Sequence, residues 1–187
     1  MAQPSRRDFL QRSTATLAAS AWLHAVGSSA KAAPSERIRV GFMGAAGRAT
    51  SLIDSFARNP AVDVIAIAEI DPARLPRGLE IAEKHQGKTI RVEQDFRKLV
   101  DDPTIDALVI GTPDHWHAIP TIMACQAGKD VYVEKPDSHN IVEGQTMVAA
   151  MRKHRRIVQM VTTGGRPTVY RWVARPLLRA LFRLQDA

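Results

Sequence analysis

Short apolar runs separated by amphipathic stretches recur along this 187-residue chain from position 37 onward. The apolar runs predict strands at 37–43, 62–69, 105–110, 130–134 and 157–161, with a weaker one near 89–92. Apolar positions three and four apart predict helices at 47–58, 73–86, 115–127 and 140–154, and a short turn at 95–100. Strands that alternate with helices are typical of a parallel sheet covered on both faces. The expected fold class is therefore α/β, a Rossmann-type doubly wound parallel sheet.

The segment 105–136 carries the most information. Its first apolar run reads as a strand buried on both faces, and Thr112-Pro113 ends it because proline cannot continue a ladder. A helical pattern follows, and the next strand delivers Glu134 and Lys135 to its carboxyl end. Ligands of open parallel sheets bind at that edge, so chemistry is expected there.

Four short motifs share the order and spacing of a known family. They are Val40-Gly41-Phe42-Met43-Gly44-Ala45-Ala46-Gly47-Arg48, Ala68-Glu69-Ile70-Asp71-Pro72, Thr112-Pro113-Asp114-His115-Trp116-His117 and Glu134-Lys135-Pro136. Over residues 37 to about 162 the chain resembles the amino-terminal half of the Gfo/Idh/MocA oxidoreductases, relatives of glucose-fructose oxidoreductase and inositol dehydrogenase. The resemblance implies NAD(P)-dependent hydride transfer on a sugar or polyol. Two alternatives stay open: an NAD-assisted glycosidase of the same fold and a non-catalytic NAD-binding fragment.

The turn after the first predicted strand is rich in glycine and alanine. Such a turn aims backbone N–H groups and the helix dipole at a pyrophosphate. Against the usual G-x-G-x-x-G, Gly44 is the first glycine, whereas Ala46 and Ala49 replace the second and third. Ala46 is the real departure, since the second glycine lets the backbone touch the phosphates, although Gly47 next to it can relieve this. We place Gly44, Ala46, Gly47 and Arg48 in the cofactor site.

Glu69 ends the second predicted strand, 25 residues after Gly44. A carboxylate there accepts the hydroxyls of the adenosine ribose and repels a 2′-phosphate, so NAD is expected and NADP is disfavoured. The alternative is a solvated acid at a strand end. The neighbouring Asp71-Pro72 indicates a helix cap and first turn.

The resemblance implies that Thr112 and Pro113 line the cofactor and that His117 lies on the nicotinamide side. His115 and Trp116 are expected to pack or to face solvent. A metal site is not expected, because no further Cys or carboxylate cluster supplies ligand spacing.

Lys135 is the candidate catalytic residue. A partly desolvated amine beside a carboxylate can orient a hydroxyl or help to move its proton. The resemblance implies that this lysine contacts cofactor ribose and substrate, that Glu134 belongs to the cofactor site, and that the Lys135–Pro136 bond is often cis. The alternative is an exposed Lys-Pro turn.

The net charge of +7 lies at the two ends of the chain, since residues 33 to 165 hold 17 basic and 17 acidic residues. A nucleic-acid binder would concentrate charge on the folded face, so no nucleic-acid partner is expected. Cys125 is the only cysteine, which rules out an intramolecular disulfide, and its place in a predicted helix indicates a packed thiol.

Residues 1–32 read as a Tat signal peptide. Arg6-Arg7 precedes a modest apolar run from Thr14 to Val26, and Ala30-Lys31-Ala32 supplies a small-x-small cleavage site. The run is shorter than the ~20 apolar residues of a membrane span. We expect export to the periplasm or another extracytoplasmic space, with an ordinary basic tail as the alternative.

Residues 33–163 are expected to form the dinucleotide-binding domain, and we expect the second α/β domain of the resembling family to be absent. From 164 to 187 the chain becomes rich in arginine, with no strand pattern, so we expect a truncated or frame-shifted gene product. The expected partners are a sugar or polyol and either a second copy or an intact relative. The rival interpretation is a basic helix face formed by Arg171, Arg175, Arg179 and Arg183, opposite leucines and a phenylalanine, that lies on an acidic surface.

Overall fold

The computed structural model describes residues 37–161 and the two-residue segment 169–170. The predicted signal peptide and most of the arginine-rich tail lie outside these residues, so both stay predictions. The strands are β1 (Ile38–Met43), β2 (Val62–Ala68), β3 (Arg91–Glu93), β4 (Ala107–Ile110), β5 (Asp130–Val133), β6 (Val158–Met160) and β7 (Val169–Tyr170). The helices are α2 (Arg48–Arg58), α3 (Leu75–Gln86), α4 (Arg97–Asp101), α5 (Ala118–Gln126) and α6 (Ile141–His154), with 3₁₀ turns η2 (Pro72–Arg74) and η3 (Asp114–Trp116).

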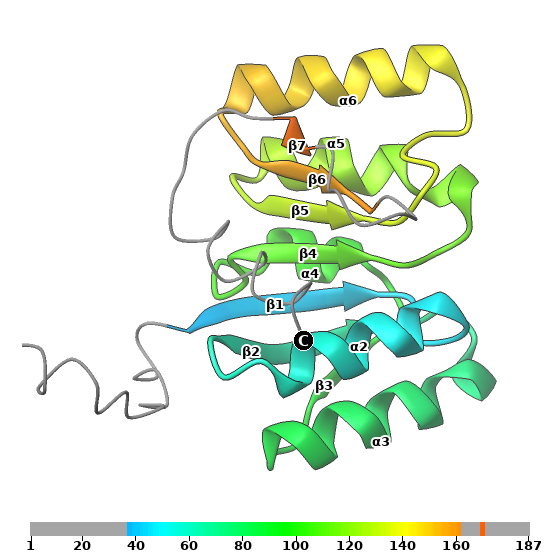
Figure 1. Cartoon of the computed structure of the whole chain (residues 1–187), viewed down its shortest axis with the longest axis vertical. Coiled ribbons are helices and arrows are strands. Elements are labelled where there is room, and N and C mark those ends of the chain that lie inside the picture. The colour runs from blue at the N-terminus through cyan, green and yellow to red at the C-terminus, as the bar shows by residue number, and fades with distance from the viewer. Residues whose placement is uncertain (1–36, 162–168, 171–187) are drawn as a thin grey trace, which may run out of the picture. The chain divides into compact units, whose positions relative to one another are not determined.

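These strands form one sheet in the order β3-β2-β1-β4-β5-β6-β7 (Figure 1). The pairings from β3 to β6 are all parallel, and β7 joins β6 antiparallel. The order 3-2-1-4-5-6 is that of a dinucleotide-binding Rossmann sheet, with its topological switch point between β1 and β4. The expected fold class is confirmed.

The main differences from the predictions are the starts of two helices and one additional strand. The sequence pattern after position 164 indicated no strand, yet Val169 pairs with Gln159 at the sheet edge. An edge strand offers unpaired N–H and C=O groups, which a short segment of any pattern can join. The helices predicted from 73 and 115 begin with the 3₁₀ turns η2 and η3, and Asp71 caps the first of them by accepting from the Ala73 N–H at 3.0 Å.

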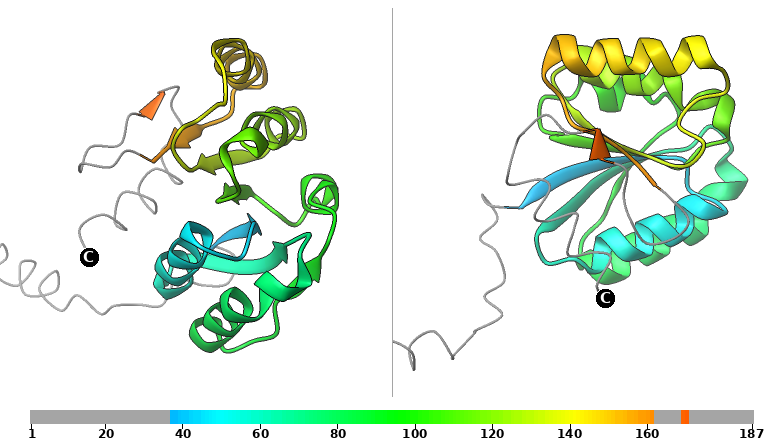
Figure 2. Two further views of the ribbon diagram at one scale, coloured as in Figure 1. Left: turned by 90° about the vertical axis from the view of Figure 1, so that its right-hand side faces the viewer. Right: turned by 45° about the horizontal axis from the view of Figure 1, so that its top comes forward.

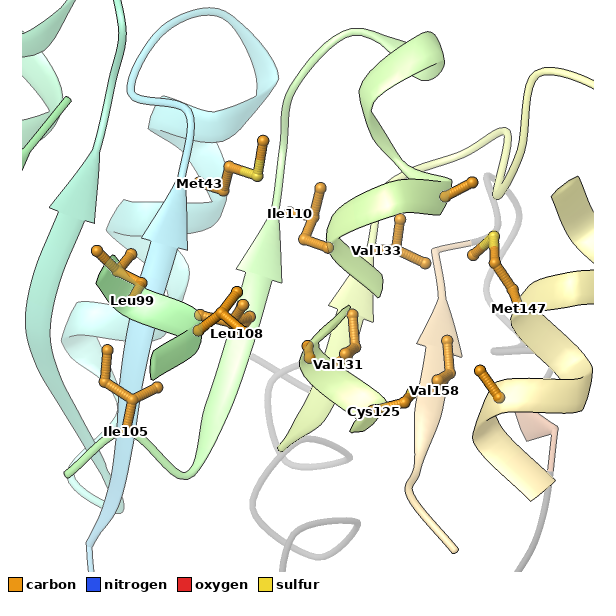
Figure 3. Packing of buried hydrophobic residues seen from close by; sticks show 14 of the residues in the cluster. Met43, Leu99, Ile105, Leu108, Ile110, Cys125, Val131, Val133, Met147 and Val158 are labelled. Carbon is orange, nitrogen blue, oxygen red and sulfur yellow. The ribbon is translucent and has the colours of Figure 1, made fainter. Parts of the chain in front are cut away.

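Helices cover both faces of the sheet (Figure 2). On one face α2 and α3 pack on β1 and β2, where the Phe56 ring meets Phe42 and Tyr132 edge to face at 5.6 and 5.2 Å. On the other face α4, α5 and α6 cover a second cluster that includes Leu99, Ile110 and Met147 (Figure 3). Burial on both faces explains why the strands read as continuous apolar runs.

Cys125 lies in this second cluster and is fully buried. Burial raises the pKa of its thiol to about 12, because the thiolate would lose its hydration. A thiol that stays protonated is a poor nucleophile, so the expectation of a packed cysteine is confirmed.

Charged groups close the amino-terminal edge of the sheet, opposite the ligand edge. The buried Lys129 ammonium donates to the carbonyl oxygens of Asp102 and Ile105 at 2.5 and 2.9 Å. Hydrogen bonds from Thr104 and then from Arg91 hold the pKa of the Asp102 carboxyl down at about 2. These contacts fasten the segment before β4. Across residues 37–161, no helix has the length and apolar character needed to cross a bilayer.

Candidate dinucleotide site

A pocket of about 410 Å³ lies at the carboxyl ends of the strands next to the switch point. Its volume is within the range of small-ligand and cofactor sites. Four loops line it: the turn after β1, the end of β2, the segment after β3 and the loop after β4. The lining residues are Met43, Gly44, Ala46, Ala68, Glu69, Ile70, Asp71, Arg74, Gln94, Phe96, Gly111, Thr112, Pro113, His115 and Trp116.

The glycine-rich turn connects β1 to α2 at one wall of this pocket. Gly44 has φ 93° and Gly47 has φ 58°, a region that glycine enters without a steric penalty. A side chain at Gly44 would also come within 3.3 Å of the Gly111 backbone. Ala46 lines the pocket and has no positive φ, so alanine is tolerated there by the backbone. No side chain caps the start of α2, which leaves its first turn open to an anion.

Glu69 lies at the end of β2 and lines the pocket, as its predicted role requires. Its carboxylate also holds the backbone around it. Oε2 accepts from the Ala45 N–H at 3.0 Å, and Oε1 accepts from the Asp71 N–H at 3.1 Å. A carboxylate offers about four acceptor positions, so two remain for ribose hydroxyls.

Side chains that the sequence did not single out form the outer wall. Phe96 and Trp116 meet edge to face at 6.0 Å, and Ile70 is 81% exposed at the rim. Trp116 packs, as expected, but it also lines the pocket together with His115. A tryptophan in the loop that follows a predicted strand was the signal that the sequence offered for Trp116. For Phe96 no local pattern distinguished it from a core residue.

His117 does not line the pocket and is only 1% exposed. Its Nδ1 lies 2.5 Å from the Pro136 carbonyl oxygen and its Nε2 lies 2.8 Å from that of Thr112. Carbonyl oxygens only accept, so a ring nitrogen that carries hydrogen donates to the carbonyl that it faces, and the neutral ring has one such N–H. His117 thus joins two loops from a buried position. Thr112 and Pro113, in contrast, line the pocket, and their contact with a cofactor stays a prediction.

Lys135 and Glu134 lie at the end of β5, outside the lining of the pocket. The Lys135–Pro136 bond is cis, as the resemblance implied. Lys135 is an exposed residue, and the partial desolvation expected for its amine stays a prediction. Glu134 is 4% exposed and is committed elsewhere: Oε1 accepts from Arg48 Nε at 2.5 Å, and Oε2 accepts from the Lys135 N–H at 3.1 Å.

Histidines and an acid also meet above η3. His115 and His139 each lie 3.5 Å from the Asp114 carboxylate, and a hydrogen bond from the His115 backbone, followed by His139, lowers the pKa of Asp114. In the described part of the chain, no group of three or more His, Cys, Asp or Glu side chains is arranged to hold a metal ion.

This fold and pocket match a known family. Residues 38–162 fit the family described as "Oxidoreductase family, NAD-binding Rossmann fold", the Gfo/Idh/MocA group. The chain belongs to this family. The expected cofactor class is therefore confirmed at the level of the family, in agreement with the glycine-rich turn and Glu69.

Individual relatives are dehydrogenases and a glycosidase. The chain is 40% identical over 74 residues to levoglucosan dehydrogenase of Pseudarthrobacter phenanthrenivorans. The aligned segment covers 40% of this chain and 19% of that one. It is 31% identical over 105 residues to α-N-acetylgalactosaminidase of Shewanella oneidensis, covering 54% of this chain and 23% of that one. The structure resembles the WlbA dehydrogenase of Bordetella pertussis, solved with NADH and UDP-GlcNAcA, with a TM-score of 0.58 and 26% sequence identity. The superposed part covers 67% of this chain and 37% of that one. The chain spans well under half the length of each.

Proposed function

We propose that residues 33–163 bind NAD in the pocket at the switch point and act in hydride transfer on a sugar or polyol. The observation that carries the proposal is the convergence, in one pocket, of the glycine-rich turn, Glu69 and the Thr112-Pro113 loop. When bound, NAD supplies the acceptor or donor of a hydride. The first turn of α2 faces its pyrophosphate, and Gly44 keeps that approach open.

Glu69 favours NAD over NADP. Its carboxylate has two acceptor positions left for the ribose hydroxyls, and its negative charge repels a 2′-phosphate. Arg74 lies in the same pocket and could attract such a phosphate, but its Nε is paired with Asp71 Oδ2 at 3.2 Å. Arg74, the one arginine among the lining residues of the pocket, is thus already partly neutralised.

Lys135 carries the chemical step in this proposal. It lies at the carboxyl end of β5, the residue is exposed, and it forms no ion pair with Glu134, whose carboxylate accepts from Arg48. A free ammonium can donate a hydrogen bond to a substrate hydroxyl or carbonyl oxygen and can hold or return its proton. Substrate binding would then supply the desolvation that is missing without it.

A second function is favoured by one relative. The similarity to α-N-acetylgalactosaminidase supports an NAD-assisted glycosidase, in which a sugar is oxidised and reduced again within one cycle. The two functions differ in what happens to the cofactor. A dehydrogenase releases reduced NAD in proportion to product, whereas the glycosidase cleaves an aryl glycoside with no net reduction.

We also propose that residues 1–32 direct export by the Tat route, which supports an extracytoplasmic site of action. The support is the twin arginine Arg6-Arg7, the short apolar run and the small-x-small site in the sequence. The Tat route carries folded proteins, so the cofactor would be loaded before crossing. Scarce free NAD outside the cytoplasm would favour a reaction that returns its hydride in each cycle.

Calorimetry tests the cofactor directly. The chain should bind NAD more tightly than NADP, and Glu69→Ala should narrow the difference. Equal affinities in the unmutated chain would contradict the assignment of Glu69. A panel of sugars and aryl glycosides with NAD, followed at the absorbance of the reduced cofactor and by aryl release, then separates the two reactions, with Lys135→Ala as the variant that should abolish either.

A further inference from the structure

The corner formed by Glu134, Lys135 and Pro136 is bonded to the glycine-rich turn on one side. Arg48, the first residue of α2, donates from Nε to Glu134 Oε1 at 2.5 Å, and the other oxygen of that carboxylate accepts from the Lys135 N–H at 3.1 Å. The start of α2 is therefore connected to the backbone of Lys135 through two side chains, those of Arg48 and Glu134.

The other side of the corner is bonded to the loop after β4. His117 lies between the carbonyl oxygens of Pro136 and Thr112, at 2.5 and 2.8 Å. The corner thus contacts two residues that border the pocket: Arg48 lies two positions after the lining residue Ala46, and His117 faces the carbonyl oxygen of the lining residue Thr112. Arg48 lies 86 residues before Glu134, and His117 lies 19 residues before Pro136. Neither contact is local.

The two bridges to the corner, from Arg48 to Glu134 and from His117 to Pro136, each include one buried residue. Glu134 is 4% exposed and His117 is 1% exposed, so solvent cannot easily replace their partners. The Arg48 side chain is 57% exposed, and its use of Nε on Glu134 leaves four further N–H donors for an anion. Arg48 can therefore bind Glu134 and a phosphate at the same time.

Lys135 depends on these bridges, because the residue is exposed and its side chain makes no hydrogen bond or ion pair with another residue of 37–161. We propose that phosphates bound at the glycine-rich turn set the position of Lys135 through Arg48 and Glu134, while His117 holds the same corner from the Thr112 side. Arg48 and His117 are positioning residues in this scheme. It rests on the proposed function, in that the pocket takes a dinucleotide. A contiguous hydrogen-bonded chain is the physical basis of the coupling.

ADP separates this coupling from direct contact, because it carries the adenosine and both phosphates but no nicotinamide ribose that could reach Lys135. In a ¹⁵N NMR titration of the full chain, saturating ADP should shift the Lys135 backbone amide. The shift should be lost in Arg48→Ala. The matched control is Arg58→Ala, which removes another exposed arginine from the same helix, one paired with Asp54 at its far end, and it should keep the shift.

His117→Gln tests the other bridge. Hydrogen exchange of the Lys135 amide should be faster in this variant at saturating ADP, whereas His85→Gln, a change in an exposed histidine of α3 outside the pocket, should leave it unaltered. If His117→Gln does not fold, the Arg48 arm decides alone. Binding of ADP with no movement of Lys135, or with equal movement in Arg48→Ala, would overturn the inference and leave the nucleotide site standing. Failure of ADP to bind would overturn the proposed function and this inference together.

Discussion

Removing the Glu69 carboxylate should destabilise the fold as well as alter cofactor choice. The buried Ala45 N–H donates to Oε2 at 3.0 Å, and Glu69→Ala leaves it without that acceptor. An unsatisfied buried donor costs about 1–3 kcal/mol. The Asp71 N–H, on a half-buried residue, can turn to water and adds less. We expect the free energy of unfolding to fall by about 2 kcal/mol.

The assay is urea unfolding of the full chain followed by circular dichroism, together with calorimetry of NAD and NADP. Glu69→Gln keeps the size of the side chain and one oxygen acceptor, so its loss should be intermediate. Glu80→Ala is the matched control, because Glu80 is an exposed acid on α3, and surface changes of this kind stay within about 0.5 kcal/mol. NAD should also bind about 10–100-fold more weakly to Glu69→Ala, as loss of charge-assisted ribose hydrogen bonds predicts.

The unfolding and the binding measurements test two separate roles of Glu69. If Glu69→Ala and Glu80→Ala unfold with the same free energy, the carboxylate does not hold the turn. If unfolding changes but the preference for NAD does not, Glu69 is a structural residue at the pocket wall and another group recognises the ribose.

Ala46→Gly should tighten dinucleotide binding, since it removes a methyl group from the pocket wall; unchanged or weaker binding by calorimetry would mean that the turn meets the phosphates in another geometry. The pKa of the Asp102 carboxyl is lowered to about 2 in the folded chain, so its ionised form stabilises the fold. This stabilisation is fully present above the ordinary pKa of an aspartate and is lost as the pH falls toward 2. The thermal midpoint of the chain should therefore drop between about pH 4 and pH 2, and Asp102→Asn should flatten that drop whereas Asp101→Asn should not. Replacing Arg6 and Arg7 with lysine should retain the chain in the cytoplasm on cell fractionation, and unimpaired export would contradict the Tat assignment.

The sheet could be predicted from the sequence because its strands are buried on both faces. Continuous apolar runs then mark them directly, and the predicted strands agree with β1, β2 and β4 to within two residues. The short β7 could not be predicted, since two residues at an edge are held by backbone groups of β6 and need no pattern.

The order of the loops around the pocket could be predicted from the sequence, but the hydrogen-bond partners of their side chains could not. Glu69 was assigned to the ribose, and nothing in the sequence indicated that it also binds the Ala45 and Asp71 amides. His117 was assigned to the nicotinamide side, whereas the structure buries it between two carbonyl oxygens. Such contacts depend on how loops far apart in sequence meet, which no local periodicity records.

Ala49, which stands at the third glycine position of G-x-G-x-x-G, and Gly111, which follows β4, limit each other's size. A Cβ atom added to Gly111 would lie 2.8 Å from Cβ and 2.9 Å from Cα of Ala49. The methyl group of Ala49 is thus admitted only because the facing residue has no side chain, and enlarging either one would push α2 away from β4. Attempts to redesign cofactor choice by mutating this turn have to treat positions 49 and 111 together: a side chain can be added at 111 only if Ala49 becomes glycine, and Ala49 cannot be enlarged because Gly111 has no side chain to remove.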